Sequence, residues 1–122
     1  MNLNAKMEIK IIKSPIKMDE LKKMAIEGFG SLVKAVVDVE QGIMALGGEL
    51  HADEEVLLME QEGSSRAYTW GVNIYPEKTG DDRIEFDSMV NLKPTLRNLS
   101  RNVENEEVRK KIIKVVNELI LR

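Results

Sequence analysis

The sequence predicts an α+β fold, with a mainly antiparallel sheet of about five strands backed by about three helices, including a long C-terminal helix. Three observations support this class. Segment 32–40 is rich in β-branched residues, and a Gln-Gly turn joins it to the apolar segment 43–47, which is expected to return antiparallel as in a hairpin. Segments 67–76 and 83–92 form a second such pair. Apolar residues then recur at helical spacing from Val108 onward, so we expect helices to cover the apolar face of the sheet.

The N-terminal part of the chain predicts a strand followed by a helix. Residues 6–13 alternate between polar and apolar side chains, which is the period of a half-buried strand, and Pro15 ends this pattern. Residues 18–27 carry apolar side chains at helical spacing. Asp19 and Glu20 lie in the first turn, where carboxylates stabilise the helix dipole, and a Gly-Phe-Gly sequence ends the helix.

A short helix is expected between the two hairpins, over residues 52–61. Its four consecutive apolar residues are also compatible with a strand, but Gly63 has the position of a C-terminal glycine. The preceding stretch GGELHADEE holds the single histidine, His51, among four carboxylates. If His51 caps the helix, Glu54 occupies the glutamate position of a capping box, and the acidic cluster has a local structural role.

The second hairpin has the clearer alternation. A centred register pairs Val72 with Phe86 and Ile74 with Ile84, which separates an apolar face from a polar one. The predicted apolar face holds Trp70, Val72, Ile74, Ile84, Phe86 and Val90. The predicted polar face holds Thr69, Gly71, Asn73, Glu85, Asp87, Met89 and Asn91.

The C-terminal quarter predicts a loop and then the longest helix. Pro94 ends the last strand, and residues 95–102 have the composition of a loop. Asn105 is expected to be the N-cap of the helix, with two glutamates in the first turn. The apolar stripe of this helix comprises Val108, Ile112, Val115, Val116, Leu119 and Ile120.

Composition limits the classes of function. The 122 residues predict one domain, 1–122, with 43% hydrophobic and 32% charged residues. The absence of cysteine excludes disulfides, thiolate metal sites and thiol nucleophiles. A net charge of −3 argues against general nucleic-acid binding, and the absence of a long apolar run argues against a membrane segment or signal peptide. We therefore expect a cytoplasmic protein, and the high charged fraction hints at a thermophilic source.

Candidate chemistry gathers at the polar face of the second hairpin and in the loop after it. Glu85 and Asp87 are two residues apart on a strand, which suits paired-carboxylate chemistry or an ordinary exposed face. Arg97 and Arg101 suit a phosphate or carboxylate, or ion pairs with the acidic residues. One histidine without cysteine makes a zinc site unusual, so no metal and no cofactor is assigned.

These residues lead to one preferred function and two alternatives. The preferred prediction is a non-catalytic binding or regulatory module for a small anionic ligand or a protein partner. Its predicted site consists of His51, Asn73, Asp87, Asn91, Arg97 and Arg101. The first alternative is a metal-assisted hydrolase or acid–base enzyme that uses Asp87, Glu85 and His51. The second is a structural subunit of a homo-oligomer.

Five motifs occur in a distinctive order along the chain: VKAVVDV, GGELHADEE, WGVNIY, IEFDSMVN and NLSRN. In combination they resemble a family of small archaeal and bacterial proteins known only as a domain of unknown function. The resemblance covers nearly the whole chain. It implies a single-domain cytoplasmic protein and transfers no catalytic residues.

Overall fold

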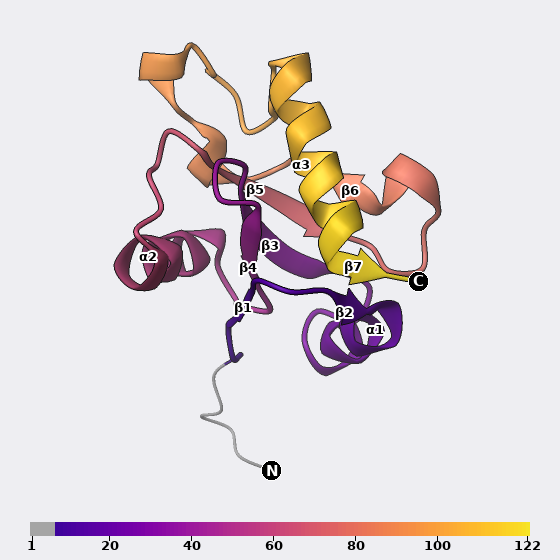
Figure 1. The fold of residues 1–122 in the computed structure, drawn as a ribbon. Helices are drawn as coiled ribbons and strands as arrows, with labels where there is room; N and C mark the ends of the chain where they lie inside the picture. The colour runs from indigo at the N-terminus through magenta and orange to yellow at the C-terminus, as the bar shows by residue number, and fades with distance from the viewer. Residues whose placement is uncertain (1–6) are drawn as a thin grey trace.

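The central sheet has five strands, as the sequence predicts, and every neighbouring pair in it is antiparallel. This computed structural model describes residues 7–122, so the first residue of the predicted strand over 6–13 lies outside the described residues. The strands follow the spatial order β1-β4-β3-β5-β6 (Figure 1). Their bounds are β1 Lys10–Ile12, β3 Val33–Asp38, β4 Ile43–Leu46, β5 Thr69–Ile74 and β6 Ile84–Glu85.

Three α-helices lie on the two faces of this sheet. Their bounds are α1 Met18–Glu27, α2 His51–Glu62 and α3 Glu106–Leu119. The Asn105 side chain accepts a hydrogen bond from the Val108 N–H, and Gly63 ends α2 in the left-handed conformation, which confirms both predicted caps. None of the helices in residues 7–122 is long and apolar enough to cross a membrane.

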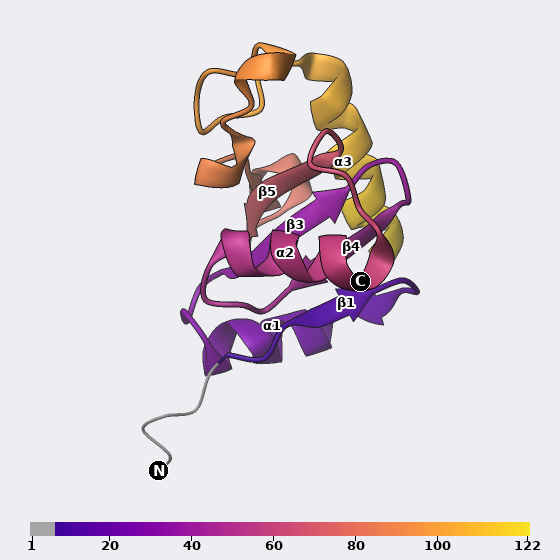
Figure 2. The same cartoon turned by 90° about the vertical axis from the view of Figure 1, so that its left-hand side faces the viewer.

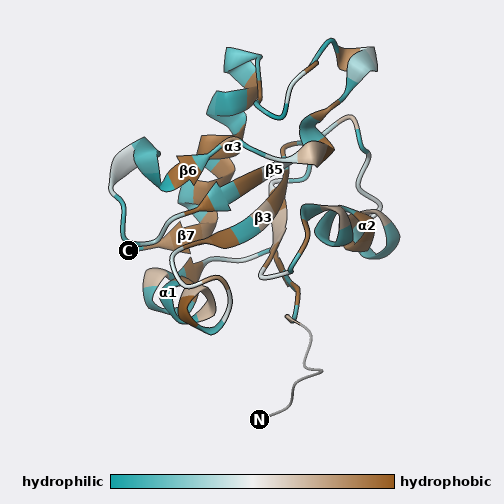
Figure 3. Cartoon of the chain, turned by 180° about the vertical axis from the view of Figure 1, so that it is seen from behind, coloured by the Kyte–Doolittle hydropathy of each residue, from teal (hydrophilic) through white to brown (hydrophobic). Residues whose placement is uncertain are grey.

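The expectation that the helices cover a single apolar face of the sheet is wrong, because they lie on both faces. Helices α1 and α3 pack on one side of the sheet and α2 packs on the other (Figures 1 and 2). The reason is that β3 and β4 are apolar on both faces: Val37 packs in the core under α1 and α3, whereas Val36 and Ala45 pack with Leu58 of α2. Hydrophobic residues accordingly lie mainly on the strands and on the helix sides that face them (Figure 3).

The second hairpin has the predicted register but a shorter ladder. Ile74 pairs with Ile84, as predicted, and pairing then ends at Asn73 and Glu85. Beyond Glu85 the chain leaves the sheet and forms the 3₁₀ turn η2, Met89–Asn91. As a consequence Val90 packs on the α2 side with Leu58, opposite to the face predicted for it.

The C-terminus departs from the predicted helix in its last turn. Helix α3 ends at Leu119, and Ile120, which the sequence places in the helical stripe, begins strand β7, Ile120–Leu121. This strand pairs in parallel with β2, Ile16–Lys17. Two residues per strand are too few for an alternation pattern, so periodicity does not predict this pairing. Arg122 follows directly after this paired strand.

Candidate functional site

His51 is the first residue of α2 and does not cap it, so the expected capping role is wrong. The N-cap is Leu50, which makes no side-chain capping bond. The imidazole instead turns onto the sheet, where Nε2 lies 2.8 Å from the carbonyl oxygen of Val72 in β5. Because a carbonyl can only accept, Nε2 must carry the hydrogen. His51 is therefore a fixed link between the start of α2 and the central sheet.

The charge state of His51 follows from its position. Burial lowers the pKa of the imidazole, the bond to the Val72 carbonyl opposes this, and the cation of Lys34 lowers the pKa further. Asp87 and Arg101 also act on this pKa, in opposite directions. The ring is thus neutral near pH 7 and lies within electrostatic range of two other predicted site residues.

Close packing explains the two glycines of the GGELHADEE motif, and Gly48 also contacts the buried Glu54. The Glu54 side chain is fully buried, and its Oε2 accepts a hydrogen bond from the Gly48 N–H at 2.9 Å. A Cβ on Gly48 would lie 2.8 Å from the Ile9 Cγ1, and one on Gly47 would lie 2.8 Å from the Glu8 carbonyl oxygen. Because this carboxylate bonds the Gly48 N–H and not the N–H of the N-cap residue Leu50, Glu54 does not form a capping box. Burial raises the pKa of its carboxyl group well above the usual range.

A connected polar surface forms where β5 and β6 meet the loop that precedes α3. The Asn73 Nδ2 donates to Glu85 Oε1 at 2.8 Å and contacts the Asp87 carbonyl oxygen at 3.5 Å. Arg101 Nε donates to Asp87 Oδ1 at 2.7 Å. We call the surface formed by His51, Asn73, Glu85, Asp87 and Arg101 the His51 surface. The structure thus brings Asp87, which follows β6, into contact with Arg101 of the loop that precedes α3.

One atom of this surface has an unmet hydrogen-bonding requirement. Asn73 is only 9% exposed, and its Oδ1 is buried without a hydrogen-bond partner in the described structure. Rotation of the amide does not remove the problem, because both acceptors on the other side, the Glu85 carboxylate and the Asp87 carbonyl, require the NH₂ group. A buried acceptor in this state costs about 1–3 kcal/mol.

Asn91 has a structural role that the sequence pattern does not predict. It is fully buried, and its side chain pairs with the backbone of Gly71, accepting from the N–H at 2.8 Å and donating to the carbonyl at 2.9 Å. The same Nδ2 donates to the Arg101 carbonyl at 2.9 Å. The side chain thus takes the place of a strand beside β5, and all of its hydrogen-bonding groups are used within the fold.

Asn98, the first residue of the NLSRN motif, and Arg97, which precedes it, have different roles. Asn98 was not predicted as important, yet it is buried and bonds the backbone of Asn91 and Asn102 at 2.7 Å each and that of Glu104 at 2.8 Å. Arg97 is exposed, has a positive φ of 60°, and makes no hydrogen bond to the described residues of the His51 surface. The structure therefore does not bring Arg97 together with the other predicted residues.

Sequence reasoning also missed Lys34 and Tyr75. Lys34 is the register partner of Asn73 on β3, and its Nζ lies 4.8 Å from the centre of the Phe29 ring. The Tyr75 hydroxyl donates to Glu85 Oε1 at 3.2 Å. The strand alternation places both on the Asn73 side of the sheet, so their signal was present. Within residues 7–122, no three His, Asp or Glu side chains lie close enough to hold a metal ion.

The fold and site define a small α+β domain with a five-stranded antiparallel sheet and a hydrogen-bonded polar surface at one end of it. The chain belongs to the family described as Protein of unknown function (DUF5674), whose model matches residues 10–119. The resemblance to an uncharacterised family is thereby confirmed. No curated protein and no solved structure matches the chain.

Proposed function

We propose that this chain is a non-catalytic binding module that docks a protein partner on the His51 surface. The observation that carries this proposal is the unmet acceptor of Asn73, which lies beside the hydrogen-bonded pairs Asn73–Glu85 and Arg101–Asp87. A hydrogen-bond donor from a partner would satisfy Oδ1 and recover the cost of its burial. Four of the predicted site residues belong to this surface: His51, Asn73, Asp87 and Arg101. Asn91 is buried and holds the Arg101 backbone through its hydrogen bond to the Arg101 carbonyl.

The composition around the surface fits a protein partner better than a small anion. Leu50, next to His51 in the chain, is 53% exposed, and Met89, two residues beyond Asp87, is 61% exposed. Exposed apolar side chains next to a half-exposed ion pair are typical of protein interfaces. The Arg101 cation is already neutralised by Asp87. A small anion would therefore have to break this pair.

The same contacts weigh against the acid–base alternative. Glu85 Oε1 accepts hydrogen bonds from Asn73 and Tyr75, and Asp87 accepts one from Arg101. These hydrogen bonds engage both carboxylates, and the His51 Nε2–H is held by the Val72 carbonyl, so the groups that this chemistry would need are already occupied. The oligomer alternative becomes a special case, in which the partner is a second copy of the chain.

The test uses Leu50→Asp. Aspartate is a preferred N-cap, and Leu50 has the extended backbone of that position, so this variant should keep or improve the stability of α2. The matched control is Ile26→Asp, which places the same charge on α1, on the opposite face of the sheet, at a residue that is 75% exposed.

Two measurements decide the result. Sedimentation of the wild type asks whether the partner is a second copy, and affinity purification from the source organism, followed by calorimetry with the purified partner, asks whether it is another protein. We expect stoichiometric binding by the wild type and by Ile26→Asp, and at least about tenfold weaker binding by Leu50→Asp. A monomeric protein with no stoichiometric partner, or equal binding by both variants, would reject the proposal.

A further inference from the structure

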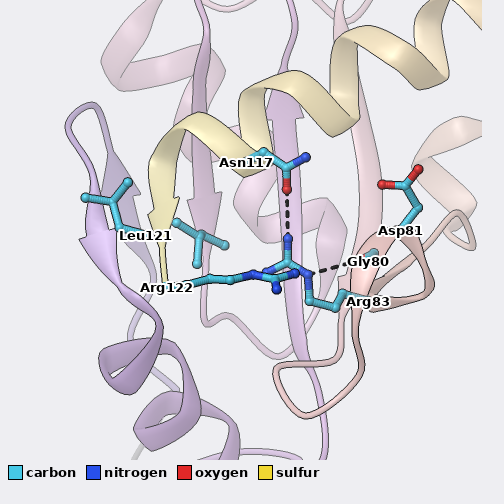
Figure 4. Close-up of a pocket in the computed structure, with 7 residues that line it drawn as sticks. Gly80, Asp81, Arg83, Asn117, Leu121 and Arg122 are labelled. Atoms are coloured by element: carbon cyan, nitrogen blue, oxygen red, sulfur yellow. Dashed lines mark hydrogen bonds between the residues drawn. The ribbon is translucent and has the colours of Figure 1, made fainter.

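A second site lies away from the His51 surface, at a buried arginine in the loop between β5 and β6. Arg83 ends the 3₁₀ turn η1, Gly80–Arg83, and is only 4% exposed. Its Nε donates to the Gly80 carbonyl at 3.2 Å, and its Nη2 donates to Asn117 Oδ1 at 2.7 Å (Figure 4). These two bonds fix the plane of the guanidinium group. The third nitrogen, Nη1, is buried without a hydrogen-bond partner in the described structure.

The charge of Arg83 is also unbalanced. No carboxylate in residues 7–122 forms an ion pair with it. Burial lowers the pKa of Arg83, the neighbouring cation of Arg122 lowers it further, and Asp81 acts in the opposite direction. Arginine stays protonated in proteins, so the buried charge persists and its free N–H groups require an acceptor.

A pocket of about 310 Å³ lies against this group. Its wall includes Arg83, Asn117, Asp81 and Arg122. The parallel pairing of β7 with β2 holds the C-terminal segment in place, and the Arg122 side chain extends toward the Arg83 guanidinium (Figure 4). Two arginines from distant parts of the chain therefore line the same hollow.

We propose that this hollow, which we call the arginine pocket, binds a small oxyanion through the Nη1 of Arg83 and the guanidinium group of Arg122. The ligand chemistry is a carboxylate or phosphate group, because these groups accept the several directed N–H bonds that arginine offers. The volume is at the lower end of the roughly 300–1,000 Å³ range of small-molecule pockets, which suits a small metabolite. This site is independent of the proposed partner surface.

A purely structural role for Arg83 explains less of the arrangement. Closing the turn η1 uses Nε, which bonds Gly80, and holding the loop against α3 uses Nη2, which bonds Asn117, so neither task needs Nη1. The presence of a second cation beside a buried one adds repulsion, which an oxyanion between them would relieve. Arg83 and Arg122 also line a second hollow of about 320 Å³.

The test is a titration of ¹⁵N-labelled protein followed by NMR of the arginine Nε–Hε and Gly80 amide signals. The probes are inorganic phosphate, malonate and chloride at matched ionic strength, so that the first two arms distinguish a phosphate from a carboxylate ligand. The test variant is Arg122→Gln, and Arg97→Gln is the matched control, since Arg97 is an exposed arginine outside the pocket. Asp81→Asn removes the competing carboxylate without touching either arginine.

We expect phosphate or malonate, but not chloride, to shift the Arg83 and Gly80 signals saturably, with a Kd of about 1 mM or tighter. Arg122→Gln should weaken this binding at least about tenfold, Arg97→Gln should change it less than about twofold, and Asp81→Asn should tighten it. The dispersion of the amide spectrum checks that each variant is folded. Absence of a saturable shift, equal losses in Arg122→Gln and Arg97→Gln, or an equal response to chloride would overturn the proposal.

Discussion

Asn91 offers the sharpest test of how the polar residues divide between fold and site. Its side chain makes three hydrogen bonds, two with the backbone of Gly71 and one with the carbonyl of Arg101. These bonds hold the segment after β6 against the otherwise unpaired part of β5. Replacement by alanine removes all three bonds and leaves the N–H and the carbonyl of Gly71 without these partners, whereas the Arg101 carbonyl still accepts from the Ser88 N–H at 3.0 Å.

The expected loss of stability follows from this count. Each hydrogen bond contributes about 1 kcal/mol net, and a buried group left without a partner costs about 1–3 kcal/mol. We therefore expect Asn91→Ala to lower the free energy of unfolding by about 3 kcal/mol or more, which is a large part of the total for a domain of this size. Asn91→Asp keeps the acceptor for the Gly71 N–H but places a carboxylate against two carbonyl oxygens, so it should be at least as destabilising near neutral pH.

Urea unfolding followed by circular dichroism measures these changes, with Asn105→Ala as the calibration. Asn105 makes one exposed capping bond, to the Val108 N–H, so its loss should cost about 1 kcal/mol. For Asn91→Asp, stability should increase as the pH falls, because the protonated carboxyl group can again donate a hydrogen bond. If Asn91→Ala lowers the free energy of unfolding by less than about 1 kcal/mol, or by as much as Asn105→Ala does, the structural role is refuted. Asn91 would then again be a candidate ligand-binding residue.

Two further predictions concern buried groups. The Glu54 carboxyl has a raised pKa, so its contribution to stability is complete below its unfolded pKa, near 4.5, and declines by about 1.4 kcal/mol per pH unit until the folded pKa is reached. Glu54→Gln should remove this decline in urea unfolding measured from pH 4 upward; an unchanged pH profile would contradict the assignment. Gly71→Ala should destabilise the fold by about 1–3 kcal/mol or more, since its Cβ would lie 2.5 Å from the Cβ of Ser88. Ser88→Gly in the same chain should recover part of that loss in thermal unfolding, and no recovery would show that the contact is not the cause.

Local patterns predicted most of the secondary structure because they depend on neighbours in the chain. The period of α3 and the capping bond of Asn105 are set within one or two turns, and the register of β5 with β6 follows from alternation and loop length. The side of the sheet taken by α2 depends on which faces of β3 and β4 remain uncovered once α1 and α3 have packed. That choice is a property of the assembled sheet, and an apolar run such as VKAVVD does not predict which face a helix will cover.

The candidate site was predictable only where it followed strand alternation. The alternation of side chains along strands places Asn73, Glu85 and Asp87 on one face. Arg101 joins them through its ion pair with Asp87, which the opposite charges of the two side chains favour. The role of Asn91 was not predictable, because a side chain that replaces a strand looks the same in sequence as one that faces a ligand. Arg83 carries no sequence signal at all, since its burial depends on Asn117, 34 residues further along the chain.

The buried polar groups of this domain fall into two sets, and the difference bears on function. In the first set the hydrogen-bonding capacity is used within the fold: Asp38 accepts from Ser64 at 2.6 Å, and Asn91 and Asn98 hold the loop before α3. In the second set a buried polar atom has no described hydrogen-bond partner: Glu54 Oε1, Trp70 Nε1, Asn73 Oδ1, Arg83 Nη1 and Lys93 Nζ. Within this set, hydrogen bonds from other side-chain nitrogens hold Asn73 and Arg83 in place. Asn73 lies beside an open polar surface and Arg83 lies against a pocket, and these are positions in which a bound molecule would complete the hydrogen bonding.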